Sequence, residues 1–244
     1  MQIVITMAGI GSRFKKAGYT VPKYEINVRG RSLFAWSMES LAAFYEPGND
    51  YYFIVRKEDD SADFIEKEWE KINGSSEGVH VIAIDHTTDG QATTAMLAAP
   101  FWKKDEPLLI YNIDTYVEAG QMRPEDVEGD GFIPCFQAPG DHWSFVETDE
   151  RGDAVKVAEK QRISDNCTVG AYYFASCALY EKIYNSYYSD GANMQKGEKY
   201  VAPLYNHMIS KGLRVRICLI DRTKVHVLGT PEELDLFSKE EGPG

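Results

Sequence analysis

The residues best suited to chemistry gather near the start of the chain, in Met7-Ala-Gly-Ile-Gly-Ser-Arg-Phe14 and Val21-Pro-Lys23. Gly9 and Gly11 follow an apolar run directly, and glycines there let the backbone approach a ligand while free amides cradle phosphate. Arg13 adds a planar bidentate donor and Lys23 a mobile point charge. The pattern does not contain GxxxxGKS/T. It is not GxGxxG either, because Phe14 stands where the third glycine would be. A tight turn with surface cations is the alternative, but the combination favours a phosphate-binding loop.

Two other segments place polar groups at the ends of expected elements. Asp114 directly follows the apolar run Leu108–Ile113, where a carboxylate can also simply cap the next turn. Asp89-Gly-Gln-Ala-Thr-Thr94 opens an expected helix, and Asp89 has the ordinary interpretation of an N-cap.

The elements that must position these groups alternate between strand and helix in the first half. Short apolar runs predict strands at Gln2–Met7, Tyr51–Val55, Val79–Ile84 and Leu108–Ile113. Helical patterns lie between them, the last at Gln91–Ala99. This order predicts a parallel, doubly wound sheet with right-handed crossovers. Ligands bind at the carboxyl ends of such strands, so we expect the glycine loop and Asp114 to face one crevice.

The second half has a different pattern. Strands are expected at Gly131–Phe136, Ser144–Thr148, Ala154–Ala158, Thr168–Phe174, Arg214–Leu219 and Val225–Leu228. Helices are expected at Cys177–Tyr187 and Tyr200–Ser210, and a capping box at Thr230 opens the last one. The tail Glu240–Gly244 is expected to be loose. No linker interrupts the chain, so residues 1–244 are predicted to form one domain.

Composition narrows the function classes. The 244 residues carry a net charge of −12, which argues against non-specific binding to nucleic acid or to an anionic membrane. No apolar run approaches the roughly 20 residues of a membrane span, and Ile3–Ile10 is too short, with no basic segment before it, for a signal peptide. The 4 cysteines are widely spaced without a CxxC pair, as in a reduced protein. We therefore predict a cytoplasmic protein.

Seven motifs together resemble the nucleotidyltransferases that activate sugar phosphates or small phosphorylated alcohols and amides. The first three are Met7–Phe14, Val21-Pro-Lys23 and Val28-Arg-Gly-Arg-Ser-Leu-Phe34. The others are Val157-Ala-Glu-Lys160, Gly170-Ala-Tyr-Tyr-Phe174, Gly197-Glu-Lys-Tyr-Val201 and Leu228-Gly-Thr-Pro-Glu232. The resemblance covers most of the chain and is nearest to members from capsule or surface-polysaccharide loci.

The resemblance implies an α/β, Rossmann-like fold of the nucleotide-diphospho-sugar transferase type, with a mostly parallel central sheet and an antiparallel part over the acceptor. It also implies a reaction in which a substrate phosphate attacks the α-phosphate of an NTP and pyrophosphate leaves. Such transfer depends on positioning and charge neutralisation. The implied partners are an NTP and a small phosphorylated substrate, the acceptor, with no nucleic acid and no membrane. A homo-oligomer is left open.

The resemblance assigns roles residue by residue. Arg13 and Lys23 would be catalytic, and Asp114 would bind the Mg2+ cofactor. The implied nucleotide-binding residues are Ala8, Gly9, Gly11, Ser12, Arg13, Gln91 and Ala92. The implied acceptor-binding residues are Trp143, Glu159, Lys160, Gly170 and Glu198.

Several of these residues also have ordinary structural interpretations. Trp143 is at a strand start, where packing is the common role. Glu159 and Lys160 could form an exposed pair on a strand. Gly170 could serve only a close backbone approach, and Glu198 could simply precede a helix.

One departure from the family pattern concerns the metal. Many members that use sugar phosphates carry a second metal-binding Asp two residues before the late Gly-Thr, where this chain has Val227. Either one metal suffices, or Asp221 or His226 contributes, or the site handles metal differently. The departure favours the branch that uses CTP and small phosphorylated alcohols or amides.

Two other functions remain open from the sequence. A glycosyltransferase with a similar sheet would use a nucleotide-sugar donor and a DxD-like motif, of which Asn112-Ile-Asp114 is only half. A non-catalytic nucleotide-binding subunit would keep the loop but would not need Lys23 and Asp114.

Overall fold

The computed structural model describes residues 1–189, 191 and 193–240, so residues 241–244 of the tail expected to be loose lie outside the described residues. The first half contains β1 (Gln2–Thr6), α1 (Ser12–Lys16), η1 (Lys23–Glu25), β2 (Asn27–Val28), β3 (Arg31–Ser32), α2 (Leu33–Glu39), η2 (Ala42–Phe44), β4 (Asp50–Arg56), η3 (Lys57–Asp59), α3 (Ala62–Asn73), β5 (Val79–Ile84), α4 (Gln91–Met96), β6 (Leu108–Asn112), β7 (Thr115–Val117) and η4 (Pro124–Asp126). The second half contains β8 (Gly131–Gln137), β9 (Ser144–Thr148), β10 (Ala154–Glu159), β11 (Asn166–Thr168), β12 (Ala171–Phe174), α5 (Cys177–Tyr187), α6 (Leu204–Ser210), β13 (Val215–Ile220), η5 (Arg222–Lys224), β14 (Val225–Val227) and α7 (Pro231–Lys239).

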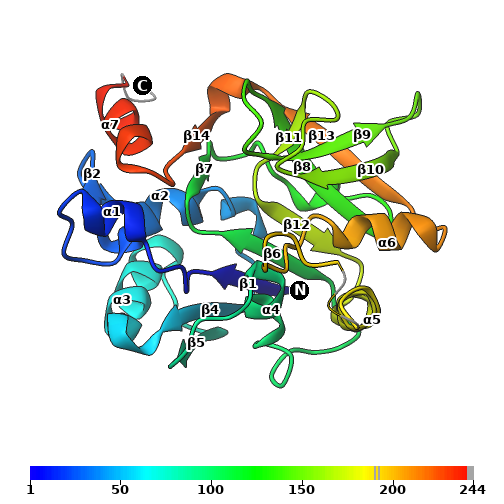
Figure 1. Cartoon of the computed structure of the whole chain (residues 1–244). Helices are drawn as coiled ribbons and strands as arrows, with labels where there is room; N and C mark the ends of the chain where they lie inside the picture. Colours follow the sequence, from blue (N-terminus) through cyan, green and yellow to red (C-terminus); the bar gives the residue numbers. More distant parts are fainter. Residues whose placement is uncertain (190, 192, 241–244) are drawn as a thin grey trace.

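The parallel core of the sheet consists of β6, β1, β4 and β5, side by side in that order (Figure 1). In β1, Val4 and Ile5 point to opposite faces and both are fully buried, as a strand covered on both sides requires. Thr6 at the end of β1 pairs with Asn112 of β6 and with Ile54 of β4. The loop after β1 therefore leaves the sheet beside Asn112, as the strand order predicts.

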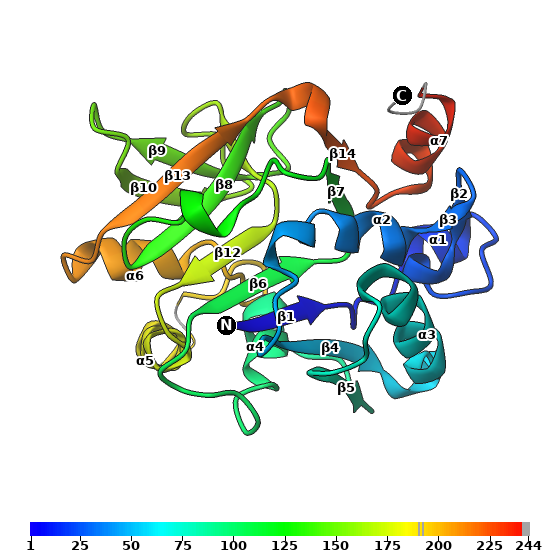
Figure 2. The same cartoon turned by 180° about the vertical axis from the view of Figure 1, so that it is seen from behind.

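Helices cover both faces of this core. Ile3 and Ile5 pack with residues of α2 and α3, on the face seen in Figure 2. Val4 packs with residues of α4, α5 and α6 on the other face. This doubly wound arrangement confirms the predicted α/β, Rossmann-like sheet.

The second half extends the same sheet with mainly antiparallel strands. From β6 the order continues β12, β8, β11, β9 and β10, and β13 pairs parallel with β8. The strand expected at Thr168–Phe174 is two strands, because Gly170 between them has a φ of +83° that ends the extended run. The predicted antiparallel part is confirmed, with this break as its main difference.

A third apolar cluster lies at one edge of the molecule and joins the two ends of the chain. Phe14 of α1, Trp36 of α2, Tyr116 of β7 and Phe237 of α7 are buried in it. The rings of Trp36 and Phe237 meet edge to face, with centroids 5.2 Å apart. The hairpin β2–β3 and the ribbon β7–β14 belong to this region, and the sequence patterns did not predict β2, β3 or β7.

Two further features bear on the earlier expectations. Each of the four cysteines is a free thiol, and Cys135, Cys167 and Cys177 are buried. In the described part of the chain, no helix combines the length and the apolar character that a membrane span needs.

Candidate active site

The glycine loop leaves the sheet at the carboxyl end of β1. The amide of Met7 still donates to the carbonyl oxygen of Ile54, at 3.0 Å, after which the chain turns away. Gly11 has a φ of +65°, a left-handed conformation that favours glycine. A Cβ at Gly9 or Gly11 would meet nothing within 4 Å, so one side of the loop backbone is open.

Arg13 and Phe14 follow the loop in the short helix α1. Phe14 is buried in the third apolar cluster and holds this helix in place. Arg13 is exposed, as are its neighbours Ser12 and Lys15. The guanidinium is therefore accessible to an anion at the end of the loop.

Lys23 and Asp114 meet although they lie 91 residues apart in the sequence. Lys23 begins η1, and Asp114 comes two residues after β6 ends. Lys23 Nζ donates to Asp114 Oδ2 at 2.7 Å, and the two side chains remain 15% and 30% exposed. The segment after α1 and the segment after β6 thus bring a cation and a carboxylate together in a partly open position.

The late Gly-Thr segment packs against Asp114. The amide of Leu228 donates to the carbonyl oxygen of Asp114 at 2.8 Å. A Cβ built on Gly229 would lie 3.5 Å from Asp114 Oδ2 and 3.5 Å from Glu233 Oε2. Glu233 is in the first turn of α7, where its amide is capped by the Thr230 hydroxyl at 3.2 Å. The sequence analysis missed Glu233, although the Thr-Pro-Glu-Glu motif contains it.

The residues considered as substitutes for the missing Asp have other partners. Val227 pairs with Thr115 in the β14–β7 ribbon. His226 directs its two ring nitrogens to Glu118 and Glu240, at 3.7 and 2.7 Å. Asp221 is exposed and accepts a hydrogen bond from the amide of Thr223.

The residues around Asp114 suit a magnesium ion. No group of three or more His, Cys, Asp or Glu side chains that could hold a metal occurs among the described residues. Mg2+ does not need such a cage, because it is usually bound by one or two carboxylates together with water and substrate phosphates. Asp114, with Glu233 across the space left by Gly229, supplies oxygen donors of that kind.

A cavity of about 310 Å³ lies between the glycine loop and the start of α4. It is lined by Thr6, Ala8, Gly9, Ile10, Thr87, Thr88, Gly90, Gln91, Thr94 and Glu198. Gln91 is fixed by a hydrogen bond from its Nε2 to Thr6 Oγ1, at 3.1 Å. A larger cavity of about 520 Å³ also has Ile10 and Thr87 in its lining, so the two adjoin.

Some of the predicted nucleotide-binding residues line this cavity and others do not. Ala8, Gly9 and Gln91 line it. Ala92 is fully buried, and its amide donates to the carbonyl oxygen of Lys199 at 3.0 Å. Glu198, expected on the acceptor side, lines the same cavity as the glycine loop.

A short segment of the second half is joined to the start of α4. The amide of Lys199 donates to the carbonyl oxygen of Asp89 at 2.6 Å, and the side chains of these residues form an ion pair at 2.8 Å. Gly90, not Asp89, is the N-cap of α4. A Cβ at Gly90 would lie 2.4 Å from the carbonyl oxygen of Lys199, so this junction requires glycine.

Glu159 is the last residue of β10, and Lys160 follows it and contacts Tyr200, next to Lys199 in the chain. The Glu159 side chain is only 7% exposed and accepts a hydrogen bond from the Ser144 hydroxyl. Burial raises the pKa of Glu159 in spite of this hydrogen bond and of Lys160 nearby. Lys160 Nζ donates to the Tyr200 hydroxyl at 2.7 Å and lies 3.7 Å from Glu159 Oε1. Glu159 and Lys160 are therefore more than an exposed pair on a strand.

Gly170 and Trp143 occupy their positions for reasons visible in the packing. A Cβ at Gly170 would lie 2.3 Å from Asn112 Nδ2, so the glycine makes room for the Asn112 side chain. Asn112 Oδ1 is buried without a hydrogen-bond partner among the described residues. The Trp143 ring packs edge to face on Phe136 at 5.3 Å, and its carbonyl oxygen accepts from the amide of Lys160 at 2.8 Å.

This chain is similar to a nucleoside-diphosphate-sugar pyrophosphorylase from Vibrio cholerae RC9 of known structure, and the two sequences are 34% identical. The two superimpose with a TM-score of 0.89, over 98% of this chain and 100% of that one. The chain belongs to the nucleoside-diphosphate-sugar pyrophosphorylase family. The resemblance to the nucleotidyltransferases is therefore confirmed, and the chain is an enzyme of this class.

More distant structures share the fold of the pyrophosphorylase. The inositol-1-phosphate CTP transferase from T. maritima has a TM-score of 0.72 at 15% identity, covering 100% of this chain and 97% of that one. A protein from Bacillus anthracis, described as a glucose-1-phosphate thymidylyltransferase in complex with a sucrose, has a TM-score of 0.76 at 14% identity, with the same coverage of 100% and 97%. No family model and no curated protein matches the sequence.

Proposed function

We propose that this pyrophosphorylase is a magnesium-dependent nucleotidyltransferase that makes an NDP-activated building block for a surface polysaccharide in the cytoplasm. The phosphate of a sugar phosphate, or of a small phosphorylated alcohol or amide, attacks the α-phosphate of an NTP in line. A new P–O bond forms at the α-phosphorus, the bond to the β-phosphate oxygen breaks, and pyrophosphate leaves. The observation that carries the proposal is the Lys23–Asp114 pair, in which the lysine that begins η1 lies 2.7 Å from the carboxylate that follows β6.

The nucleotide is assigned to the glycine-loop side. Its base and ribose enter the cavity lined by Ala8, Gly9 and Gln91, whose volume of about 310 Å³ is in the range of small-molecule sites. The open amides from Gly9 to Ser12 and the exposed guanidinium of Arg13 bind the phosphates. Charge-assisted hydrogen bonds from such donors hold the leaving pyrophosphate.

Lys23 and Asp114 act at the reacting phosphate. Lys23 carries an ammonium group to the α-phosphate and offsets the charge brought there by the incoming phosphate. Asp114, with Glu233 opposite, would hold Mg2+, which supplies charge neutralisation at the α-phosphate oxygens when bound. On the acceptor side, Lys160 binds the incoming phosphate and the buried Glu159 binds a hydroxyl or amide of the acceptor.

The proposal also names the nucleotide. We propose CTP as the nucleotide, because Val227 departs from the pattern of the sugar-phosphate members and one structural neighbour is a CTP transferase. Another neighbour is described as a thymidylyltransferase, so the test must include every common NTP. A thermal-shift screen with CTP, UTP, dTTP, ATP and GTP identifies the base, because the NTP that binds raises the Tm by mass action.

The function itself is tested by pyrophosphate release from the NTP found in that screen with Mg2+ and a panel of sugar and alcohol phosphates. Lys23→Ala and Asp114→Asn are each expected to lower kcat/KM by about 100- to 1,000-fold, as for loss of a charge aimed at the transition state. The matched control is Lys103→Ala, which removes another ion-paired lysine, 3.0 Å from Asp50 at the amino end of β4. Full activity of both site variants would contradict the site, and consumption of an NDP-sugar without pyrophosphate would favour a glycosyltransferase.

A further inference from the structure

Among the side-chain contacts of the Lys160 ammonium group in the described part of the chain, the shortest is to the Tyr200 hydroxyl. Lys160 Nζ donates to the Tyr200 hydroxyl at 2.7 Å and lies 4.6 Å from the centroid of the Tyr200 ring. The distance to the neighbouring Glu159 carboxylate is 3.7 Å. The backbone contributes as well, because Lys160 has a φ of +52° and donates its amide to the carbonyl oxygen of Trp143. A left-handed backbone is strained for a lysine and persists only where surrounding contacts hold it. These contacts therefore fix both the backbone of Lys160 and the direction of its side chain.

The Tyr200 hydroxyl keeps its proton and can still accept a hydrogen bond from Lys160. Burial raises the pKa of Tyr200 above its ordinary value, and the nearby Glu198 carboxylate raises it further. A protonated phenol oxygen retains lone pairs, so it can accept from Lys160 Nζ. Glu198 also lines the cavity between the glycine loop and α4.

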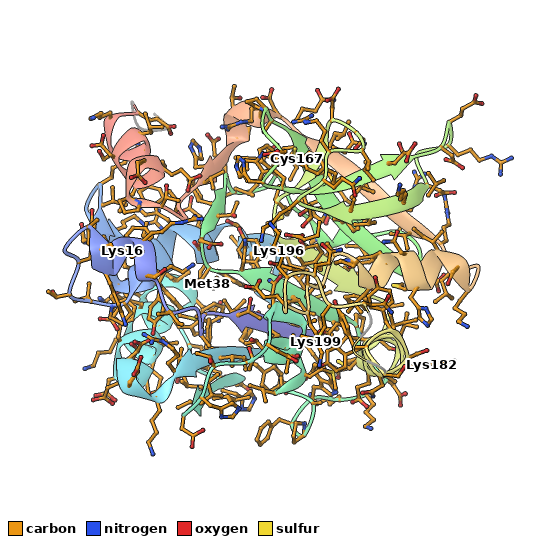
Figure 3. All side chains as sticks on the ribbon, viewed as in Figure 1. Lys16, Met38, Cys167, Lys182, Lys196 and Lys199 are labelled. Carbon is orange, nitrogen blue, oxygen red and sulfur yellow. The ribbon has the colours of Figure 1, made fainter. Side chains whose placement is uncertain are left out.

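The segment that carries Tyr200 is itself anchored. The Tyr188 hydroxyl donates to the carbonyl oxygen of Tyr200 at 2.7 Å, and Lys199 is paired with Asp89. In Figure 3, Lys196 and Lys199 of this segment lie in the middle of the molecule, between Lys16 of α1 and Lys182 of α5. These contacts anchor the backbone of the segment without using the Tyr200 hydroxyl. The hydroxyl can therefore hold the Lys160 side chain in a fixed place.

We propose that Tyr200 is a positioning residue, which holds the Lys160 ammonium toward the acceptor phosphate. The inference rests on the proposed function, because it assumes that Lys160 binds that phosphate. Tyr200 itself does not touch the reacting atoms. It restricts a long, 43% exposed lysine side chain to one direction, so less conformational freedom is lost when the phosphate binds.

The test is Tyr200→Phe, which removes the hydroxyl and keeps the aromatic ring beside Lys160. With the NTP and acceptor found in the pyrophosphate screen, KM for the acceptor is expected to rise about tenfold, the worth of one hydrogen bond to a charged group. KM for the NTP is expected to stay within about twofold, and kcat at saturating acceptor to change less than the acceptor KM.

The matched control is Tyr188→Phe, which removes a hydroxyl that supports the same segment through the Tyr200 carbonyl only. It is expected to leave the acceptor KM near the wild-type value. An unchanged acceptor KM in Tyr200→Phe, or an equal rise in both variants, would show that Tyr200 only supports the fold. Absence of pyrophosphate from the wild-type enzyme with every substrate pair would overturn the proposed function and this inference with it.

Discussion

The two halves of the sheet contribute to the candidate site in different ways. In the parallel half, the functional groups follow the ends of β1 and β6, and the pairing of Thr6 with Asn112 already places them together. In the antiparallel half, the groups come from irregular segments, such as Lys160 with its positive φ and Tyr200 before α6. Strand register thus brings the glycine loop and Asp114 to one edge of the sheet, whereas Lys160 and the start of α4 depend on contacts between loops.

The largest effect is expected where the two halves meet. Gly90 has φ 137° and ψ 173°, a backbone region almost restricted to glycine, and a Cβ there would lie 2.4 Å from the Lys199 carbonyl oxygen. Gly90→Ala should therefore lower the free energy of unfolding by about 3 kcal/mol or more, since strain and a backbone clash add. Urea denaturation measures this change.

The control for Gly90→Ala is Gly9→Ala, because a Cβ on Gly9 meets nothing within 4 Å. We expect almost unchanged stability for Gly9→Ala but a higher KM for the NTP, because Gly9 lines the cavity proposed to bind the nucleotide. Equal stability of the two variants would show that the junction between the halves tolerates displacement.

A smaller effect is expected at the ion pair across this junction. Hydrogen bonding to Asp89 raises the pKa of Lys199, which is only 18% exposed. Lys199→Ala should release the start of α4 and raise the KM for the NTP by about threefold, the worth of a partly exposed ion pair. The acceptor KM should change less, the reverse of the pattern expected for Tyr200→Phe. Lys196→Ala, an exposed lysine in the same segment, is the control, and an equal change there would contradict the role of the ion pair.

The smallest effect is a pH-dependent gain in stability. Burial raises the pKa of Glu159 above its ordinary value of 4.5, so the folded protein keeps a proton that the unfolded chain has lost. Stability therefore falls as pH rises through this window, and the cost persists above it. Glu159→Gln removes the cost, so the Tm at pH 8 should rise by about 2–4 °C for each kcal/mol recovered. Near pH 4 the two Tm values should converge, while activity falls at all pH values.

Glu147→Gln is the control for this measurement, because Glu147 is an exposed glutamate on the adjacent strand β9. Its Tm should follow the wild type at each pH. A constant difference between Glu159→Gln and the wild type from pH 4 to pH 8 would show that the carboxyl group is not the source.

Regular elements of the fold could be predicted because their patterns are local. Helix α5 and strand β9 begin and end where the sequence predicts, and the parallel core follows from its buried apolar runs. Elements that depend on partners far along the chain could not be predicted. Strand β7 is three residues long and exists because β14 pairs with it. The close approach of the Asn112 side chain to Gly170, which leaves no room for a Cβ, is likewise a contact that no neighbouring residue indicates.

The same limit applies to the candidate site. A shared edge for the glycine loop and Asp114 was predictable, because the carboxyl ends of neighbouring parallel strands meet there. The positions of Glu233 and Tyr200 were not, since they depend on how the late segments fold back over the sheet. For Glu198, the sequence indicated a functional residue but not that it lines the cavity beside the glycine loop.

The bond from the Leu228 amide to the Asp114 carbonyl oxygen has a consequence for how the enzyme is made. Protein synthesis delivers the chain from its N-terminus, and the parallel half is finished long before Leu228 emerges. The backbone around Asp114 gains its last partner only when the segment from Val227 to α7 has been added. A ribosome-bound chain that already contains the whole glycine loop would therefore still lack the segment that packs on Asp114, the residue proposed to hold the metal.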